Sequence, residues 1–411
     1  MKDLTYLKGK TIAVLGAGAV GKTVAADCVL GGNKVNICDL MPYAEKTLFA
    51  LEKTGIEITG EQTNLFAFHR SGKAFYNMVT TSIEECVKGC GIVIVAVPAM
   101  GHKVFFEKLI PVLEDGMIVH IIPDNYGTMV LRKMMREADC KKNIIVGGWS
   151  SAPYGCRVME TGGVNLPMVK IAYRAITLRG AALPSKNNET FLKSIDYLAC
   201  FDAITKGQGA VAGETVMDIG FSNINPVLHC PGTILGVGVM ENWGILYGGN
   251  DKKTYSIYSH AYCKSIAEVQ YAFYKEEIEL AEIMGVGIQK YEKKKFFSRV
   301  SVLGAEYMGE DYEVPYSEQY YRGMGSGPHT IYNRYITEDI PVGCHIYHLL
   351  GKKFDVQTRI IDSMINLACA MTGIDFYKDG MTLEDIGIHN MKKEEMLVYL
   401  KEGMLYEDMS K

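Results

Sequence analysis

The chain has 411 residues, more than a single hydrophobic core usually holds, so two domains are expected. Hydrophobic residues make up 48% and charged residues 22%, with a formal net charge of -4, as in ordinary soluble globular proteins. No basic patch with interleaved aromatic residues favours nucleic-acid binding, and no segment is long and apolar enough to span a membrane. The polar amino terminus and the eleven cysteines, an odd number, predict a cytoplasmic protein without a disulfide framework or a metal site.

The first half of the chain alternates short apolar runs with helical segments. The expected strands span residues 11–15, 34–38, 91–97, 117–122 and 143–147, and a helix is expected from about Val20 to Leu30. Near-continuous runs of valine and isoleucine are typical of parallel strands that are covered on both faces. The pattern predicts an α/β Rossmann fold, with a doubly wound parallel sheet, for an N-terminal domain of residues 1–185.

The second half of the chain changes to helical periodicity. Residues 169–183 read as further strand, and the polar segment 184–188 is the best break between domains. The expected helices span residues 258–284, 354–371, 384–387 and 392–403. These features predict a mostly α-helical C-terminal domain of residues 186–411, with the ligand site between the two domains.

A glycine-rich motif joins the first expected strand to the first helix. It consists of Gly16, Ala17, Gly18, Ala19, Val20 and Gly21. In this context Gly16 permits the tight turn, Gly18 lets the backbone approach a pyrophosphate, and Gly21 allows close packing of strand and helix. The start of the helix offers free N–H groups and a positive dipole end to phosphates. We therefore expect a dinucleotide cofactor; a turn that only packs is the alternative.

Asp39 ends the second expected strand, eighteen residues after Gly21. Its carboxylate would accept hydrogen bonds from an adenosine ribose and repel a 2′-phosphate, and residues 40–42 supply no arginine for that phosphate. NAD is therefore favoured over NADP, and NADH over NADPH. Val97, Pro98 and Ala99 end another strand, where they are expected to line the path of the nicotinamide ribose. We assign no role to His102.

Two polar residues of the helical half are candidates for proton transfer. His229 lies in the segment 222–229, and Asp339 lies in the segment 334–341. A histidine that is oriented by a carboxylate gives and takes protons near neutral pH. Taken singly, His229 could satisfy a backbone group in a kinked helix, and Asp339 could be a helix cap. Substrate carboxylates need cationic partners, and Arg157, Arg174, Arg179 and Arg322 are the arginines available.

From the glycine-rich motif to about residue 388, the chain resembles the opine dehydrogenases of the octopine/nopaline dehydrogenase family. Besides residues 16–21 and 97–99, the resemblance is carried by segments 222–229, 327–328, 334–343, 356–359, 372–375 and 381–383. The chain departs from the family's pattern at Cys230, which separates His229 from Pro231, and at the segment 236–238.

The resemblance implies an enzyme that condenses an amino acid with a 2-oxo acid and reduces the imine by hydride transfer from NAD(P)H. It also implies that His229 and Asp339 form the catalytic pair. Arg334 would lie near the cofactor pyrophosphate, and Asn223 and Asn225 near the substrate. Fold analogy further suggests a homodimer.

Two other interpretations are open. The same cofactor and histidine–carboxylate pair would serve an enzyme that reduces a 2-oxo acid or a free imine directly. A non-catalytic, NAD-binding regulatory module belongs to a different class of protein, and it would tolerate the loss of His229.

Overall fold

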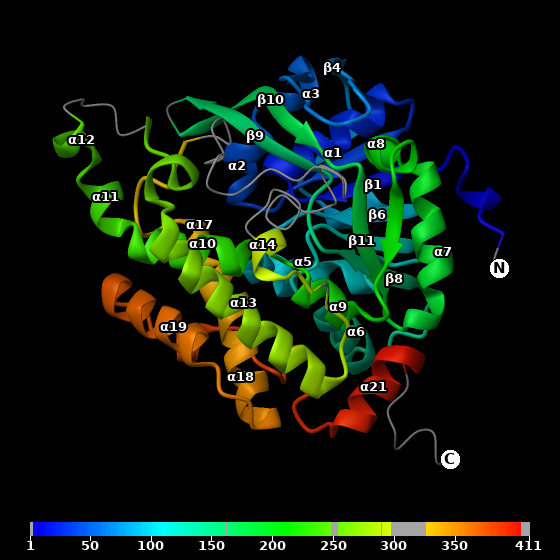
Figure 1. Cartoon of the computed structure of the whole chain (residues 1–411). Helices are drawn as coiled ribbons and strands as arrows, with labels where there is room; N and C mark the ends of the chain where they lie inside the picture. Colours follow the sequence, from blue (N-terminus) through cyan, green and yellow to red (C-terminus); the bar gives the residue numbers. More distant parts are fainter. Residues whose placement is uncertain (1–2, 162, 248–253, 289, 297–325, 404–411) are drawn as a thin grey trace. The chain divides into compact units, whose positions relative to one another are not determined.

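The computed structural model describes residues 3–161, 163–247, 254–288, 290–296 and 326–403. Contacts within the chain divide these residues into two compact units. The first comprises residues 3–219 and 394–403, and the second comprises the described residues between 220 and 393. The boundary expected after residue 185 stays a prediction, because compactness alone does not define a functional domain. Each unit is described by itself below and can be followed in Figure 1.

The first unit is built on an eight-stranded sheet with the order β12-β11-β8-β7-β6-β1-β2-β5. Its strands are β1 (Ile12–Leu15), β2 (Val35–Cys38), β5 (Met78–Thr80), β6 (Ile92–Val95), β7 (Ile118–Ile121), β8 (Ile145–Trp149), β11 (Thr177–Ala182) and β12 (Gly209–Ala212). The six strands from β5 to β8 are parallel, which confirms the predicted doubly wound fold. However, β11 pairs with β8 in the antiparallel sense, so the sheet is mixed at this edge.

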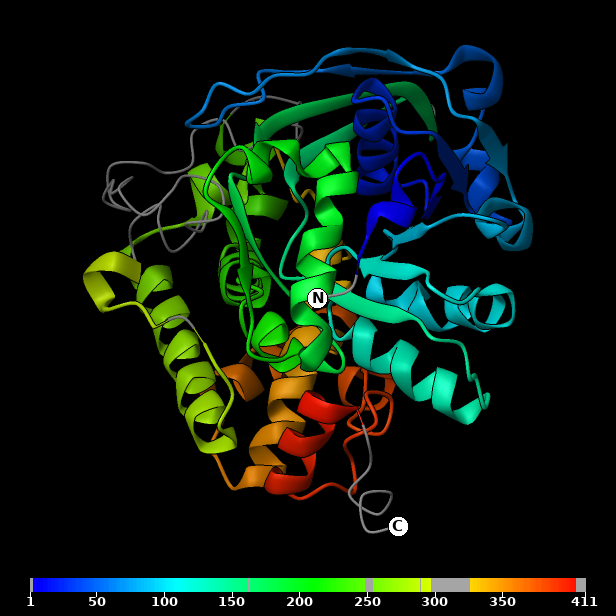
Figure 2. The same cartoon turned by 90° about the vertical axis from the view of Figure 1, so that its right-hand side faces the viewer.

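The first unit also contains helices. They are α1 (Ala19–Leu30), α2 (Tyr43–Thr47), α3 (Leu51–Thr54), α4 (Ile83–Val87), α5 (His102–Leu109), α6 (Gly127–Glu137), α7 (Asn188–Lys193), α8 (Asp202–Thr205) and α21 (Lys393–Glu402). Helix α5 packs against α4 and α6, and α5 and α6 appear in cyan in Figure 2. All four residues of β1, β2, β6 and β7 are buried, because the sheet is covered on both faces.

A second, four-stranded sheet in the first unit was not predicted. Its order is β4-β3-β10-β9, with β3 (Ile56–Thr59), β4 (Gly72–Ala74), β9 (Tyr154–Thr161) and β10 (Val164–Arg174). All four strands contact α1. The run expected as one further strand over residues 169–183 instead contains the end of β10 and the whole of β11, which belong to different sheets.

A buried ion pair ties α1 to this second sheet. The guanidinium of Arg174 on β10 bonds both carboxylate oxygens of Asp27 on α1, at 2.7 and 3.1 Å, and both side chains have no exposed surface. Arg70 adds a further contact to Asp27 at 3.2 Å. Arg174 is therefore a structural residue, which removes it from the four arginines that were open as partners for substrate carboxylates. Arg322, another of the four arginines, lies outside the described residues.

An aromatic cluster forms part of the core of the first unit. Trp149 on β8 stacks on His120 of β7 and donates from Nε1 to its Nδ1 at 3.1 Å. The other ring nitrogen of His120 lies 2.9 Å from Ser194 Oγ. Burial lowers the pKa of His120 to about 3, so the ring is neutral at physiological pH and has a structural role.

The second unit is mostly helical, as predicted. Its helices are α10 (Asn225–Leu235), α11 (Val237–Glu241), α12 (Trp243–Leu246), α13 (Lys264–Met284), α14 (Lys293–Phe296), α17 (Arg334–Thr337), α18 (His345–Phe354), α19 (Arg359–Thr372) and α20 (Phe376–Asp379), and α9 (Val216–Phe221) leads into it. Two π-helical turns, η8 (Ile257–Ala261) and η10 (Asp339–Cys344), interrupt the α-helical pattern. Helix α10 contacts α13, α17 and both π-turns.

Several predicted helix boundaries need correction. The helix expected from residue 258 starts with the turn η8, and α13 begins only at Lys264. The helix expected over residues 354–371 begins at Arg359, because α18 ends at Phe354 and Asp355 adopts a left-handed conformation with φ of 57°. Residues 384–387 form a turn and not a helix, whereas the helix expected over 392–403 is present as α21.

Candidate active site

The glycine-rich turn has the geometry of a dinucleotide cradle. Gly16 follows β1 with φ of +95°, and a Cβ atom there would lie 2.6 Å from the Ala96 carbonyl oxygen. A Cβ on Gly21 would overlap the Gly16 carbonyl oxygen. A Cβ on Gly18 would meet nothing within 4 Å, so the approach to the start of α1 is open. These positions fit the three roles expected of the motif, and the open one fits a pyrophosphate.

The turn lies at the switch point of the sheet. Strands β2 and β6 flank β1 on opposite sides, and ligands of doubly wound sheets bind where the strand order reverses in this way. Val97, Pro98 and Ala99 follow β6, so they leave the sheet beside the turn that follows β1. His102 is buried and stacks on Phe106, and burial lowers its pKa to about 4. His102 thus packs in the core of the first unit, and no role in the site is assigned to it.

Asp39 is held against the glycine-rich turn and is only 6% exposed. Its Oδ2 accepts hydrogen bonds from the Ala17 N–H at 3.1 Å and the Thr47 hydroxyl at 2.7 Å, and its Oδ1 accepts one from the Leu40 N–H at 2.9 Å. The carboxylate is thus fixed at the end of β2, where this fold places the adenosine ribose.

Lys22 is a neighbour of this acid that the sequence analysis missed. Its side chain is fully buried, and Nζ has no hydrogen-bond partner among the described residues. Burial lowers the pKa of Lys22 to about 8, and the nearby Asp39 carboxylate partly opposes that shift. The position of Lys22 directly after Gly21 was the only available signal, and the motif itself gives that position no role.

The second unit brings His229 and Asp339 together, although they are 110 residues apart in sequence. His229 lies on α10, and Asp339 is the first residue of the π-turn η10. His229 Nδ1 lies 2.7 Å from Asp339 Oδ2, and the two side chains are only 10% and 8% exposed. A buried carboxylate at this distance fixes the imidazole orientation and stabilises its protonated form.

Two tyrosines that were not predicted complete the surroundings of the imidazole. The Tyr258 hydroxyl lies 2.9 Å from His229 Nε2, and the Tyr335 hydroxyl lies 3.3 Å from the Tyr258 hydroxyl. The Tyr335 ring stacks on the imidazole with a centroid separation of 3.7 Å. Tyr335 belongs to the motif around Asp339, but nothing in the sequence pattern singles out Tyr258.

The remaining candidate residues differ in their surroundings, because Arg334 is exposed and Asn223 is hydrogen-bonded to the backbone. The Arg334 side chain is 63% exposed, and its guanidinium lies 3.2 Å from the Glu338 carboxylate one helical turn later. Asn223 accepts a hydrogen bond from the Asn225 N–H at 3.1 Å, so its side chain helps to start α10. Arg334 is thus open to a ligand, while Asn223 also has a structural role.

Cys230, where the chain departs from the family's pattern, places a thiol next to His229 in the sequence. Cys230 Sγ lies 3.7 Å from Cys344 Sγ, and both residues are buried. Burial raises the pKa of the Cys230 thiol well above its ordinary value, which disfavours the reactive thiolate. This pair packs as small apolar groups, as expected for cysteines in apolar runs.

A second histidine–aspartate pair offers a useful comparison. His348 Nδ1 on α18 lies 2.7 Å from Asp362 Oδ1 on α19, which also accepts a bond from the Thr358 hydroxyl at 3.0 Å. The Asp362 side chain is 37% exposed. This pair lies outside every motif that carries the family resemblance, so it serves below as a control.

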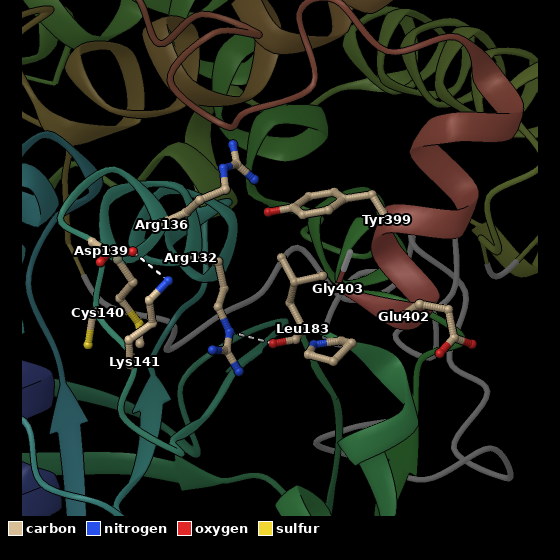
Figure 3. Close-up of a pocket in the computed structure, with 11 residues that line it drawn as sticks. Arg132, Arg136, Asp139, Cys140, Lys141, Leu183, Tyr399, Glu402 and Gly403 are labelled. Atoms are coloured by element: carbon tan, nitrogen blue, oxygen red, sulfur yellow. Dashed lines mark hydrogen bonds and ion pairs between the residues drawn. The ribbon is translucent and has the colours of Figure 1, made fainter. Parts of the chain in front are cut away.

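A cavity of about 300 Å³ in the first unit contains none of the predicted site residues (Figure 3). It is lined by Arg132, Met135, Arg136, Asp139, Cys140, Lys141, Leu183, Pro184, Tyr399, Glu402 and Gly403. Arg132 donates to the carbonyl oxygens of Leu183 at 2.6 Å and Ile144 at 2.9 Å, and Arg136 lies over the Tyr399 ring. The Arg136–Tyr399 contact joins α6 to α21, and the lining residues form no constellation suited to catalysis.

Two features, a metal-binding cluster and a membrane-spanning helix, are absent from the described residues. No group of three or more histidine, cysteine, aspartate or glutamate side chains within them is arranged to hold a metal ion. None of the helices seen in these residues combines the length and apolar character that a bilayer crossing requires.

Comparisons with known proteins find similar sequences. The family described as NAD/NADP octopine/nopaline dehydrogenase, alpha-helical domain, matches residues 212–372. An opine dehydrogenase of Arthrobacter sp. (strain 1C) is 24% identical over 389 residues, covering 94% of this chain and 97% of the relative. Vitopine synthase of Allorhizobium ampelinum is 21% identical over 381 residues, covering 92% and 95%.

Solved structures of low sequence identity share the fold. An octopine dehydrogenase structure with NADH and pyruvate has a TM-score of 0.67 at 16% identity, covering 93% of this chain and 96% of the other. A yersinopine dehydrogenase structure with NADP+ has a TM-score of 0.61 at 11% identity, covering 95% and 97%.

The fold and these matches define the protein as an NAD(P)-dependent oxidoreductase. Residues 212–372 match the alpha-helical domain of the octopine/nopaline dehydrogenase family, and the chain is a distant homologue of the opine dehydrogenases. The resemblance seen in the sequence is thereby confirmed.

Proposed function

We propose that this protein is an opine dehydrogenase that condenses an amino acid with a 2-oxo acid and reduces the resulting imine with NADH. The observation that carries the proposal is the buried pair of His229 and Asp339, whose nitrogen and oxygen lie 2.7 Å apart. Forming an imine moves protons twice, because the carbonyl oxygen must be protonated and then leave as water. A histidine held by a buried carboxylate can provide both transfers near neutral pH.

The residues of the pair have distinct roles in this proposal. Asp339 keeps the proton of the neutral imidazole on Nδ1 and stabilises the imidazolium, so that Nε2 is the nitrogen that exchanges protons. When bound, NADH supplies the hydride that adds to the imine carbon. The first 185 residues would hold the cofactor, and residues 186–411 would provide the substrate-binding and catalytic groups.

The preference for NADH over NADPH rests on Asp39. Its fixed carboxylate would repel a 2′-phosphate, and no arginine follows it in residues 40–42. Structures with NADH and with NADP+ both occur among the related folds, so the choice has to come from this chain's own residues.

Arg334, Asn223 and Asn225 are proposed to meet the ligands. Arg334 has an exposed guanidinium whose planar fork suits a pyrophosphate oxygen pair. Asn223 and Asn225 lie at the start of α10, within one to two helical turns of His229. Amide side chains at this place would orient the amino acid or the 2-oxo acid.

Oxidation of NADH, measured with amino acids paired with pyruvate and other 2-oxo acids, tests this function. Turnover should require both the amine and the 2-oxo acid. His229→Ala should lower turnover by roughly 10²-fold or more, the range for a lost general acid–base. His348→Ala is the matched control, because it removes the histidine of the other close pair, and it should leave turnover within about threefold.

Other outcomes would change the assignment. Turnover with a 2-oxo acid alone, or with a preformed imine alone, would make the protein a simple reductase. Binding of NADH without turnover, unaffected by His229→Ala, would indicate a non-catalytic module.

A further inference from the structure

Both ring nitrogens of His229 already have partners. Nδ1 lies 2.7 Å from Asp339 Oδ2, and Nε2 lies 2.9 Å from the Tyr258 hydroxyl. The stacked Tyr335 ring covers one face of the imidazole. No ring nitrogen of His229 is therefore left for direct contact with a substrate while this arrangement persists.

The hydrogen bonds fix the direction in which protons move. An ionised Asp339 can only accept, so Nδ1 carries a proton. In the neutral ring Nε2 is then an acceptor, and the Tyr258 O–H donates to it. In the imidazolium, Nε2–H donates to the Tyr258 oxygen, and the Tyr258 O–H turns to a second acceptor, which is either the Tyr335 hydroxyl at 3.3 Å or a substrate oxygen.

From this geometry we propose that Tyr258 is the catalytic residue that exchanges the proton with the substrate, with His229 and Asp339 as the relay behind it. The inference rests on the proposed function for the identity of the substrate. The relay itself needs only a substrate carbonyl oxygen that must be protonated, whether an amine attacks it or not.

The surroundings of Tyr258 support a fixed position. It lies in the π-turn η8, and the ring packs edge-on against Tyr262 with centroids 5.7 Å apart. Asp339 opens the other π-turn, η10. Single π-turns are rare and occur often at functional sites, and here each one presents a partner to one nitrogen of the same imidazole.

The condensation step balances through this relay. The amine nitrogen bonds to the keto carbon, and the carbonyl oxygen takes the proton of the Tyr258 O–H while that oxygen takes the proton from His229 Nε2. The new ammonium nitrogen gives one proton back to the relay. The hydroxyl then receives that proton and leaves as water, which forms the iminium that the NADH hydride reduces. Counted from the neutral amine, the relay gives two protons and takes back one, so it supplies one proton net. The iminium carries that proton, and His229 regains it from solvent before the next turnover.

Tyr258→Phe tests the proposal, because it keeps the ring and removes only the hydroxyl. The turnover number should fall roughly 10²-fold or more, with the substrate KM values changed less than threefold. A double variant with His229→Ala should be no slower than His229→Ala alone, since groups that act as a unit are non-additive. Tyr332→Phe is the matched control, because its hydroxyl bonds the Thr372 carbonyl oxygen at 3.0 Å.

A second measurement does not depend on turnover. The ¹⁵N chemical shift of His229 Nε2 should differ between the parent protein and Tyr258→Phe, and Tyr332→Phe should leave it unchanged. An unchanged shift in Tyr258→Phe would overturn the relay, and so would turnover within threefold of the parent. If the parent enzyme reduces a 2-oxo acid without any amine, the condensation is wrong, but Tyr258→Phe must still lose turnover for the relay to stand.

Discussion

Asp339→Asn isolates the charge of the proposed catalytic pair, because asparagine keeps the size and the hydrogen-bonding ability of aspartate. The carboxylate oxygen lies 2.7 Å from His229 Nδ1, so the centres of charge in the protonated pair are about 4 Å apart. At an effective dielectric constant of about 20, this attraction is worth about 4 kcal/mol. Every 1.36 kcal/mol is a factor of ten in rate, so turnover should fall about 10³-fold.

The assay is steady-state oxidation of NADH with saturating amino acid and 2-oxo acid. Binding of NADH, followed by its fluorescence, should remain near that of the parent protein. The double variant with His229→Ala should be about as slow as His229→Ala alone. If the two losses multiply, Asp339 acts on something other than His229 and the reasoning is refuted. Asp362→Asn, in the other close histidine–aspartate pair, should change turnover by less than threefold.

Two further predictions concern the cofactor end of the first unit. Asp39→Ala should narrow the preference for NADH over NADPH, because it removes the repulsion of the 2′-phosphate. Equal use of both cofactors by the parent enzyme would show that Asp39 does not set the preference. Lys22→Met should stabilise the cofactor-free protein at pH 7 by about 3 kcal/mol, because burial lowers the Lys22 pKa from 10.5 to about 8. Between about pH 8 and 10.5, the unfolded chain keeps a proton on Lys22 that the folded chain has lost. The free energy of unfolding of the parent should therefore rise with pH from about 8 to 10.5, and Lys22→Met should lose that rise. Thermal unfolding followed by circular dichroism measures both effects, and a lower melting temperature for Lys22→Met at pH 7 would contradict them.

The parts of the fold that follow from local patterns were predictable from the sequence. The cradle at Gly16 to Gly21 was predictable because the motif is contiguous in sequence, although the close contact of Gly16 is with Ala96, which follows β6. The second sheet was not, because its strands lack the continuous buried apolar runs of the main sheet. The role of Arg174 was hidden for a related reason: its partner Asp27 is 147 residues away, and no spacing rule connects them.

The contact between His229 and Asp339 was predictable only through the family resemblance, because each residue has ordinary structural alternatives when taken singly. Tyr258 was beyond reach by either route. Helical periodicity from residue 258 predicted a regular helix, whereas the structure has a π-turn that ends at Ala261. The hydrogen bonds of a π-turn span one residue more than those of an α-helix. A count of apolar positions in the sequence does not resolve this difference.

The π-turn from Asp339 to Cys344 implies an intolerance to changes of chain length. A π-turn amounts to an α-helix with one inserted residue, and α18 continues directly from it. Deleting any one of residues 340–344 would restore α-helical spacing, although Pro341, where it is kept, has no N–H to donate. The deletion would also rotate Asp339 by about 100° relative to α18 and carry its carboxylate away from His229. In a library of single-residue deletions, this short segment should therefore yield folded but inactive proteins, even though its local helix would be more regular than the natural one.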